Sequence, residues 1–389
     1  MTTTAKSKTE YSPGLEGVMA GYTAISEVDG NVDKLIYRGY DVEELVEACS
    51  FDEVAYLLLF GKLPNCVELT DFRRTVGENR HVPGVVYDLL DHFPPDTHPM
   101  DTLRAAVSTL AAFDEDRYDN SREANLRKAV RLYAQMPTLV VNSHRILLNL
   151  PPIAPDPMLD HNTNFFHMLG SLALRPVSLS DAHGLREDVF NVTQICYAEH
   201  GFNASTFAAR VTVSTLSDLH SGIVSAIGTL KGPLHGGANE AAMAMLEEIG
   251  EASKASEWVK KALAEKKKVM GFGHREYKKG DVRAGIVKKR AVALGQKMGD
   301  THWHDISDIV EQEMLASKGL YPNVDFPVAS AYGLMGIPTP LFTPIFVMAR
   351  ITGWCAHIIE QLDNNRLIRP ANGYNGPHDL KVATLEDRC

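Results

Sequence analysis

The sequence predicts an all-α protein. Apolar residues recur at three- and four-residue spacing through most of its 389 residues, whereas alternating strand patterns are short and few. Apolar residues make up 44% of the chain and charged residues 23%, which is ordinary for a soluble globular protein. We see no internal repeat of 20–50 residues, so a solenoid is not favoured. The length predicts two or three domains.

The expected helices follow in order along the chain. Asp41 can cap a first helix, in which Val42, Leu45, Val46 and Cys49 repeat with helical spacing. A second helix, over residues 51–60, ends near Gly61. The same periodicity predicts further helices over residues 101–112, 122–136, 204–229, 239–250, 256–267, 284–298, 304–317 and 344–362.

Residues 329–349 carry no charge over a length that could span a membrane. Pro338, Pro340 and Pro344 would leave backbone groups unpaired in lipid. We therefore expect a buried loop that leads into a buried helix, and no membrane contact.

Charge is distributed unevenly. The net charge is 39 − 49 = −10, which makes the whole molecule a poor partner for nucleic acid. Residues 260–290 nevertheless hold 12 Lys and Arg against three acidic residues, a local charge of +9. Such a run is more often a solvated helix face than a site.

The expected location is a reducing cytoplasm. The first residues, MTTTAKSKTEYSPG, show no apolar segment of a secretory signal. The five cysteines are widely spaced and form no CxxC, which argues against a disulfide framework or a zinc knuckle: Cys49, Cys66, Cys196, Cys355 and Cys389. Cys196 is expected to pack rather than to react.

The segment GPLHGGANE (232–240) places His235 in a glycine-rich turn just before a helix. A helix N-terminus disfavours imidazolium, and a neutral imidazole can donate a hydrogen bond to a developing enolate oxygen. A capping or core histidine is the structural alternative. A lipase-type oxyanion loop would need a G-x-S-x-G elbow, which the chain lacks.

The segment MGFGHREYKKGDVR (270–283) places His274 in a second glycine-rich loop. It is not a G-x-G-x-x-G dinucleotide fingerprint. Neighbouring lysines suit a ligand with several phosphates, and Arg283 could form a fork onto a carboxylate. These lysines are Lys266, Lys267, Lys268, Lys278 and Lys279.

The segment YPNVDF (321–326) places Asp325 beside the uncharged stretch. Burial would raise its pKa and make it a stronger base, although a helix-capping Asp is the commoner case. Arg350 and Arg369 flank the other end of this region. The H-x-H of His302 and His304 is expected to be structural, with Thr301 as a helix cap.

Together these segments resemble the citrate synthase family, in particular its shorter bacterial citrate synthase and 2-methylcitrate synthase type. The resemblance runs from GLEGV (14–18) and IYRGYDVEEL (36–45) to LIRP (367–370). The spacings of 39 residues from His235 to His274 and 51 from His274 to Asp325 make the combination specific.

The resemblance implies an all-α homodimer with a large domain (1–221 and 331–389) and a small mobile domain (222–330). It implies a tricarboxylic acid cycle enzyme that condenses acetyl-CoA with oxaloacetate, without a metal or a permanently bound cofactor. The coenzyme A thioester is a co-substrate. The closest alternative is 2-methylcitrate synthase, which uses propionyl-CoA.

The resemblance also implies roles for individual residues. His235 would stabilise the enol, Asp325 would take the proton and His274 would protonate the new alkoxide. Arg369 would reach into the active site of the partner subunit. The remaining implied residues are His200, Arg283, Arg350 and Arg369 for oxaloacetate; Lys268, Val269, Met270, Gly271, Phe272 and Lys278 for coenzyme A; and Ser205 and Asn323 as supports of the two histidines.

Three positions depart from the family pattern, namely Glu276, Val282 and Pro327. They leave the affinity for coenzyme A and the shape of the acyl pocket open. Two further alternatives are a metal-dependent acyl-transfer enzyme, which needs H-x-H on a barrel strand, and a helical scaffold protein without activity. The helical pattern disfavours the first, and the combined motifs disfavour the second.

Overall fold

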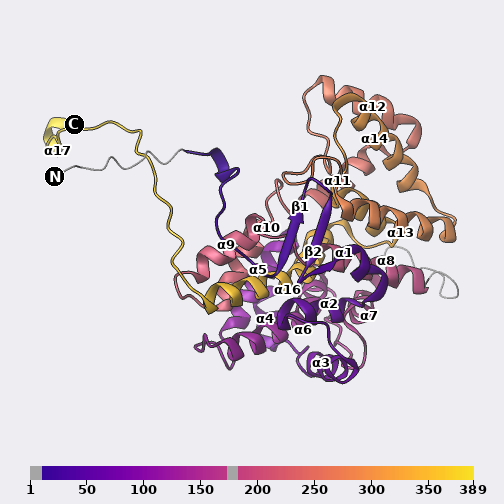
Figure 1. Ribbon diagram of the computed structural model, residues 1–389, viewed down its shortest axis with the longest axis horizontal. Coiled ribbons are helices and arrows are strands. Elements are labelled where there is room, and N and C mark those ends of the chain that lie inside the picture. The colour runs from indigo at the N-terminus through magenta and orange to yellow at the C-terminus, as the bar shows by residue number, and fades with distance from the viewer. Residues whose placement is uncertain (1–10, 173–182) are drawn as a thin grey trace.

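The structure is a computed structural model that describes residues 11–172 and 183–389. Helices make up nearly all of its regular structure, which confirms the all-α prediction (Figure 1). Part of the N-terminal segment on which the absence of a signal was argued, residues 1–10, lies outside the described residues. The helices are α1 (Val42–Ala48), α2 (Phe51–Phe60), α3 (Cys66–Glu78), α4 (Gly84–Leu90), α5 (Pro99–Ala111), α6 (Arg122–Leu147), α7 (His161–Leu169), α8 (His183–Tyr197), α9 (Ala204–Val213), α10 (Leu219–Leu230), α11 (Ala238–Ile249), α12 (Ala252–Ala264), α13 (Val282–Met298), α14 (His302–Lys318), α15 (Asp325–Leu334), α16 (Phe342–Asp363) and α17 (Leu385–Arg388), with short 3-10 turns at Pro13–Leu15, Gly170–Leu172 and Thr339–Leu341.

A small antiparallel sheet precedes the helices. Its strands are β1 (Ser26–Asp29), β2 (Lys34–Tyr37) and β3 (Tyr40–Asp41), with Ser26 opposite Tyr37. Tyr37 is fully buried, and its hydroxyl lies 2.9 Å from the carbonyl oxygen of Glu199. The sheet thereby holds the backbone just before His200.

Local chemistry explains where several helices begin and end. The Asp41 carboxylate accepts from the backbone N–H of Glu43, which confirms it as the cap of α1. Helix α2 has the expected bounds and ends at Gly61 in the left-handed region. Thr301 occupies the N-cap position of α14 as expected, but its hydroxyl donates to the Asp305 carboxylate and does not accept from a backbone N–H of the helix.

The single helix expected over 204–229 is wrong. Helix α9 ends at Val213, Leu216 takes a positive φ of 67°, and Asp218 caps α10 through the backbone N–H of Ser221. Apolar periodicity continues through the break because both helices bury one face. Helix α6, by contrast, runs beyond residue 136 to Leu147 despite Pro137 within it.

The uncharged stretch is more helical than expected. Residues 329–334 belong to α15, so a loop there is wrong, and the connection to α16 covers only residues 335–341. Pro344 lies in the first turn of α16, where a missing N–H breaks no helical hydrogen bond. Thr339–Asp363 is long and apolar enough to cross a membrane, but its most apolar window is 100% buried within the protein. It is a core helix.

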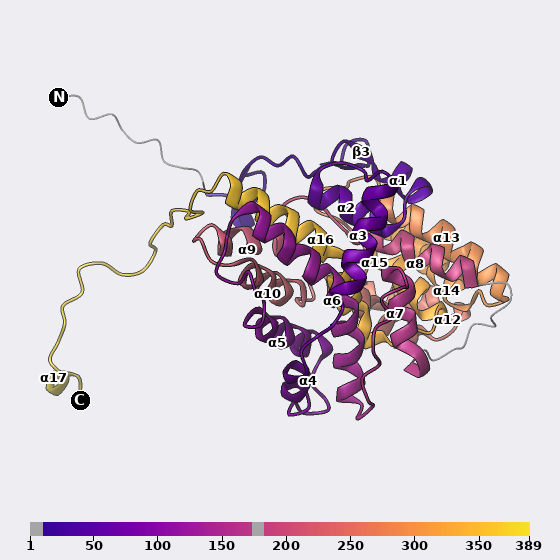
Figure 2. The ribbon, with the colours of Figure 1, turned by 90° about the horizontal axis from the view of Figure 1, so that it is seen from below.

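Helix α16 is the central element of the fold. It packs against α6, α9, α10, α2 and α8, and Figure 2 shows it alongside α6. Arg350 and Trp354, on this helix, are among the largest fully buried side chains. Helices α11 to α15 gather on one side of this body (Figure 1). The expected domain boundary at residue 222 falls within α10, which packs against α9, α5 and α16.

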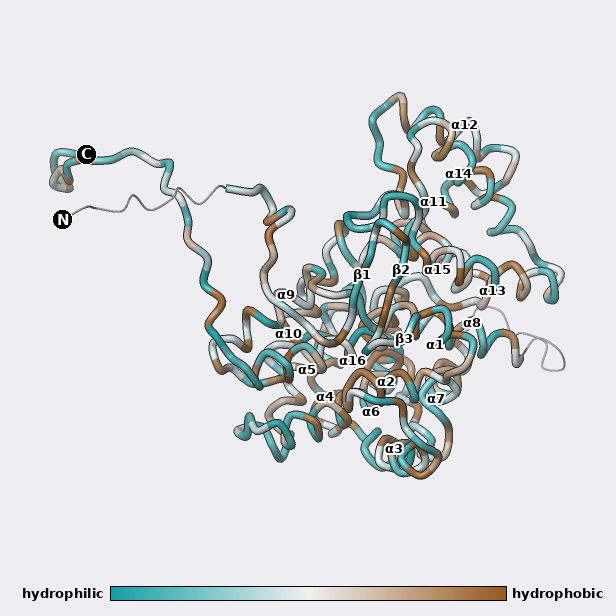
Figure 3. Tube along the Cα trace, viewed as in Figure 1, coloured by the Kyte–Doolittle hydropathy of each residue, from teal (hydrophilic) through white to brown (hydrophobic). Residues whose placement is uncertain are grey.

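The surface follows the amphipathic pattern. Figure 3 shows hydrophilic and hydrophobic residues on the outer helices, and long hydrophilic stretches along the C-terminal tail. Asn365 and Ile368, just after α16, still bond to Ser214 of the body, and the chain beyond them extends away from the body in both ribbon views (Figures 1 and 2). Leu367, Tyr374 and Leu380 in this tail are exposed.

Candidate active site

His235 lies in the turn between α10 and α11. The turn needs glycine, because a Cβ on Gly236 would lie 2.5 Å from Leu230 Cγ. His235 Nε2 is 2.8 Å from Ser205 Oγ and 3.3 Å from the backbone nitrogen of Ser205. A backbone N–H can only donate, so Nε2 accepts and the proton belongs on Nδ1. Nδ1 has no hydrogen-bond partner in the described residues.

Burial, together with the positive charge of Arg350, lowers the pKa of His235 to about 3. The side chain is therefore a neutral imidazole near neutral pH. With Nδ1–H free, it can donate a hydrogen bond to an oxygen atom of a ligand.

His274 is held in the opposite tautomer. Its Nδ1 accepts from the backbone N–H groups of Glu276 (3.1 Å) and Tyr277 (3.3 Å), which favours the proton on Nε2. Nε2 also lies 3.5 Å from Nη2 of Arg283, but that nitrogen already donates to Asp281 at 2.8 Å. Burial, and then the charge of Arg283, lower the pKa of His274 to about 4, while Asp281 opposes this shift. His274 can therefore also act as a neutral hydrogen-bond donor.

Asp325 is the first residue of α15. Its carboxylate accepts from the Tyr197 hydroxyl at 2.7 Å, and its backbone N–H donates to Asn323 Oδ1. Burial raises the pKa of Asp325 to about 6 against the opposing effects of Tyr197 and Arg283. A carboxylate of this kind is a suitable general base near neutral pH.

Two arginines are buried beside these groups. Asp281 binds Nε and Nη2 of Arg283 at 2.9 and 2.8 Å, so the fork expected to hold a carboxylate ligand is already filled. Nη1 of Arg283 has no hydrogen-bond partner in the described chain. Arg350 donates through Nε to the carbonyl of Tyr197 at 2.5 Å, and its guanidinium lies 4.7 Å from the centre of the Phe346 ring.

Aromatic and imidazole rings connect these residues into one site. The His200 ring lies 5.0 Å from that of His274, and its Nε2 is 3.3 Å from the Tyr277 hydroxyl. Phe346 stacks on Tyr197 at 3.8 Å and faces His235 at 6.4 Å. Burial lowers the pKa of His200 well below its usual value, as do the charges of Arg283 and Arg350.

The two supporting residues act differently. Ser205 contacts its histidine directly, as described above. Asn323 does not touch the His274 ring, but its Nδ2 donates to the carbonyl of Gly273 at 3.1 Å. It also accepts from Asp325 N–H, so it links the backbones that carry His274 and Asp325.

The basic residues of segment 260–290 fall into two groups, those that form ion pairs and those that do not. Six of its twelve basic residues contact carboxylates: Lys260, Lys267, Arg275, Arg283, Lys288 and Arg290. The other six form no ion pair within the described residues: Lys261, Lys266, Lys268, Lys278, Lys279 and Lys289. Lys268 and Lys278 are exposed, and Lys278 lines a cavity of about 230 Å³ together with His274.

The loop 268–272 is held tightly. Phe272 pairs with Pro322 in an isolated antiparallel bridge, and Gly271 has φ 82° with no room for a Cβ against Phe326. Val269, Gly271 and Phe272 are buried, whereas Met270 is partly exposed. Arg369 lies in the exposed C-terminal tail, where its guanidinium donates to the carbonyl of the neighbouring Pro370 and to no residue of the site among the described residues.

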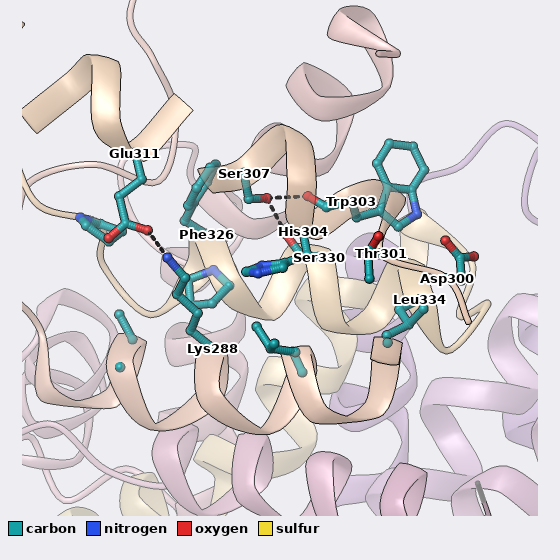
Figure 4. Close-up of a pocket in the computed structure, with 17 residues that line it drawn as sticks. Lys288, Asp300, Thr301, Trp303, His304, Ser307, Glu311, Phe326, Ser330 and Leu334 are labelled. Carbon is teal, nitrogen blue, oxygen red and sulfur yellow. Dashed lines mark hydrogen bonds and ion pairs between the residues drawn. The ribbon is translucent and has the colours of Figure 1, made fainter. Parts of the chain in front are cut away.

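A second pocket, of about 80 Å³, lies between α13, α14 and α15 (Figure 4). None of the expected site residues lines it. His304, from the H-x-H, contacts Asp308 at 3.2 Å, and no His, Cys, Asp or Glu cluster in the described residues could hold a metal. Pro327 lines this pocket, whereas Glu276 serves His274 through its backbone.

Sequence reasoning missed the residues that hold the site residues in place. Tyr197 binds Asp325, Asp281 binds Arg283 and also accepts from Val324 N–H at 3.0 Å, and Tyr277 contacts His200. Asp281 could have been found as a helix cap, since it lies three residues before the helix predicted over 284–298 and is the N-cap of α13. Tyr197 could not, because its partner is 128 residues away.

A helical fold that gathers neutral histidines, a carboxylate of raised pKa and buried arginines defines an enzyme suited to acid–base catalysis on an anionic substrate. The family model described as "Citrate synthase, C-terminal domain" matches residues 14–371. The chain belongs to the citrate synthase family, and it is a transferase of the citrate synthase type.

Individual relatives cover almost the whole chain. It is 45% identical over 379 residues to a 2-methylcitrate synthase of Mycobacterium tuberculosis, covering 97% of this chain and 94% of that one. It is 43% identical over 380 residues to citrate synthase 2 of Bacillus subtilis, covering 97% and 99%. The solved ternary complex of Thermoplasma acidophilum citrate synthase with carboxymethyl coenzyme A and oxaloacetate is 34% identical, with TM-score 0.89 and coverage of 97% and 100%.

Proposed function

We propose that the protein condenses acetyl-CoA with oxaloacetate and hydrolyses the resulting thioester to citrate and free coenzyme A. The observation that carries this proposal is the pairing of a base of raised pKa, Asp325, with a neutral histidine donor, His235, across the Tyr197–Phe346 stack. A solved relative binds a coenzyme A analogue together with oxaloacetate.

The proposed reaction begins at the methyl group of acetyl-CoA. Asp325 removes a proton from the methyl group while Nδ1–H of His235 donates a hydrogen bond to the thioester oxygen and stabilises the developing enolate. Such proton transfer contributes about 10²–10⁴ in rate. The enolate carbon then attacks the ketone of oxaloacetate, and Nε2–H of His274 donates its proton to the new alkoxide.

The oxaloacetate carboxylates would bind to the arginine nitrogens that have no partner among residues 11–172 and 183–389. These are Nη1 of Arg283 and the terminal nitrogens of Arg350, with His200 directed at the ketone. Asp281 holds Arg283 rigidly, so little side-chain entropy is lost on binding. Exposed lysines around loop 268–272, among them Lys268 and Lys278, supply charge for the phosphates of coenzyme A.

Assembly and location follow from the same resemblance. We propose a homodimer in which Arg369 completes the active site of the partner subunit, with residues 222–330 as the main part of a small domain that closes over the substrates. We also propose a cytoplasmic location for the protein. The proposed pathway is the tricarboxylic acid cycle.

The second candidate is 2-methylcitrate synthesis from propionyl-CoA. It is favoured by the 45% identity to the Mycobacterium tuberculosis 2-methylcitrate synthase. One methylene changes binding by about 1–3 kcal/mol, so the same site can serve either thioester. The kcat/KM values for the two thioesters, measured on one preparation, decide between them.

The direct test is release of coenzyme A thiol from acetyl-CoA and oxaloacetate. The wild-type protein is expected to release it, and Asp325→Ala to reduce the rate at least about a thousandfold, since the base is removed. Near-normal release by this variant would contradict the role of Asp325.

A further inference from the structure

Trp354 lies one helical turn after Arg350 on α16. Its side chain is fully buried, and its indole N–H donates to Ser205 Oγ at 3.1 Å. An indole nitrogen can only donate, and a buried donor without an acceptor is unfavourable. Helix α16 therefore presents one arginine to the substrate site and one indole donor to the serine beneath His235.

The Ser205 hydroxyl lies within reach of three groups. Besides the indole, His235 Nε2 and Asn203 Oδ1 are each 2.8 Å from Oγ. Ser205 is itself fully buried. Its single hydroxyl proton can go either to the imidazole or to the amide oxygen, and the choice decides where His235 carries its own proton.

Two neighbouring backbone N–H groups favour donation of the Ser205 hydroxyl proton to the imidazole of His235. The backbone N–H of Ser205 is aimed at Nε2 at 3.3 Å, so a proton on Nε2 would face another donor. Asn203 Oδ1 already accepts from the backbone N–H of Thr206 at 3.1 Å, and does not need the serine. Nε2 is therefore the acceptor, and Nδ1 carries the proton.

We propose that Trp354 is a positioning residue that, by fixing the Ser205 hydroxyl, holds His235 in the tautomer with its proton on Nδ1. This inference rests on the proposed function of His235 as a donor to the thioester oxygen. Serine can rotate to other rotamers and bond to local backbone carbonyls. The indole N–H ties Oγ to the rotamer that reaches Nε2, since leaving that rotamer would strand a buried donor.

The test is a double-mutant cycle between Trp354→Phe and Ser205→Ala, measured by coenzyme A thiol release. Trp354→Phe keeps an aromatic ring but loses the donor. We expect kcat to fall about tenfold, as befits one lost hydrogen bond, with the KM for oxaloacetate changed less than about twofold. In the Ser205→Ala background, Trp354→Phe should cause no further loss.

The control is Trp258→Phe. This indole donates to Glu248 at 3.0 Å at the surface, and its loss should leave kcat unchanged. A second readout is the ¹⁵N spectrum of histidine-labelled protein, with His235 assigned by its loss in His235→Gln. The wild type should show a protonated Nδ1, and Trp354→Phe a mixture of tautomers.

Two results would overturn the inference. One is an equal loss of kcat in both backgrounds, which is what a general loss of folded protein would produce. The other is an unchanged His235 spectrum in Trp354→Phe. Failure of the proposed function would look different, because the wild-type protein would then release no thiol.

Discussion

At the scale of single residues, the same two arginines do two things in the site. They are the proposed binding groups for the substrate carboxylates, and their charge disfavours imidazolium at His235, His274 and His200. Burial is the larger cause in each case. Both causes act toward neutral histidines, which donate a hydrogen bond through one ring nitrogen while the other nitrogen accepts.

The ionised Asp325 carboxylate, which the reaction needs as a base, is expected to lower the stability of the folded protein. Its pKa is raised from 3.8 to about 6, so the native state binds the proton more tightly than the unfolded chain. The ionised carboxylate therefore costs stability that is absent below pH 3.8 and complete above pH 6. At pH 7.5, Asp325→Asn should raise the free energy of unfolding by up to about 3 kcal/mol while abolishing thiol release.

Urea denaturation at two pH values checks this expectation. At pH 5 the increase in the free energy of unfolding caused by Asp325→Asn should be about half of that at pH 7.5, because the wild-type carboxyl is then largely protonated. In the wild type, kcat/KM should fall below pH about 6 for the same reason. The ionisable groups that influence this carboxyl are Tyr197, Asp281, Arg283 and Arg350. Asp305→Asn, at an exposed carboxylate on α14, is the control and should change stability by less than about 0.5 kcal/mol. A loss of stability in Asp325→Asn at pH 7.5 would contradict the assignment.

At the scale of elements, the sequence predicted those helices whose apolar face is regular and whose ends carry breakers. It missed the split between α9 and α10, since the Leu216 turn contains no Gly or Pro. It missed α3, whose apolar positions are sparse, the helices α4, α7, α8 and α15, and the strands, which are too short to show alternation. Motif residues were predictable because they are local, whereas Tyr197 and Trp354 meet their partners only through tertiary packing.

Close packing of α16 against the end of α8 depends on Gly353. A Cβ at this position would overlap both the Ala198 carbonyl and the Glu199 carboxylate. We expect Gly353→Ala to lower the free energy of unfolding by about 1–3 kcal/mol, because backbone and a buried side chain must both move. Since His200 follows this segment directly, the KM for oxaloacetate should rise.

The matched control for Gly353→Ala is Gly285→Ala on α13. This glycine is exposed within a helix and has nothing within 4 Å of an added Cβ. Here alanine should stabilise the protein by about 0.5–1 kcal/mol, through the smaller entropy of the unfolded chain. Thermal unfolding and oxaloacetate saturation curves on both variants check the pair. If Gly353→Ala and Gly285→Ala changed thermal stability and the KM for oxaloacetate equally, the α8–α16 contact would not be close-packed.

At the scale of the whole molecule, the net charge does not show where unpaired positive charge lies until the ion pairs are known. Half of the basic residues between 260 and 290 are neutralised by carboxylates, Arg283 by Asp281 of the same segment and the other five by residues elsewhere in the chain, among them Glu47 and Glu16. The remaining lysines lie mainly around loop 268–272. The −10 of the whole chain therefore conceals a local positive surface where a polyphosphate ligand is expected.

The C-terminal tail gives the strongest test of assembly. Arg369 is exposed on a tail that leaves the body of its own subunit, whereas Asp325 lies inside it. If Arg369 completes the site of the partner subunit, Asp325→Ala and Arg369→Ala subunits are each inactive as homodimers, but a mixed dimer contains one intact site. After equal amounts are unfolded together and refolded, about a quarter of wild-type thiol release should return, as random pairing in a two-fold dimer requires. Each variant refolded alone is the control. If Arg369 served its own chain, every site in the mixture would lack one residue, and no activity would return.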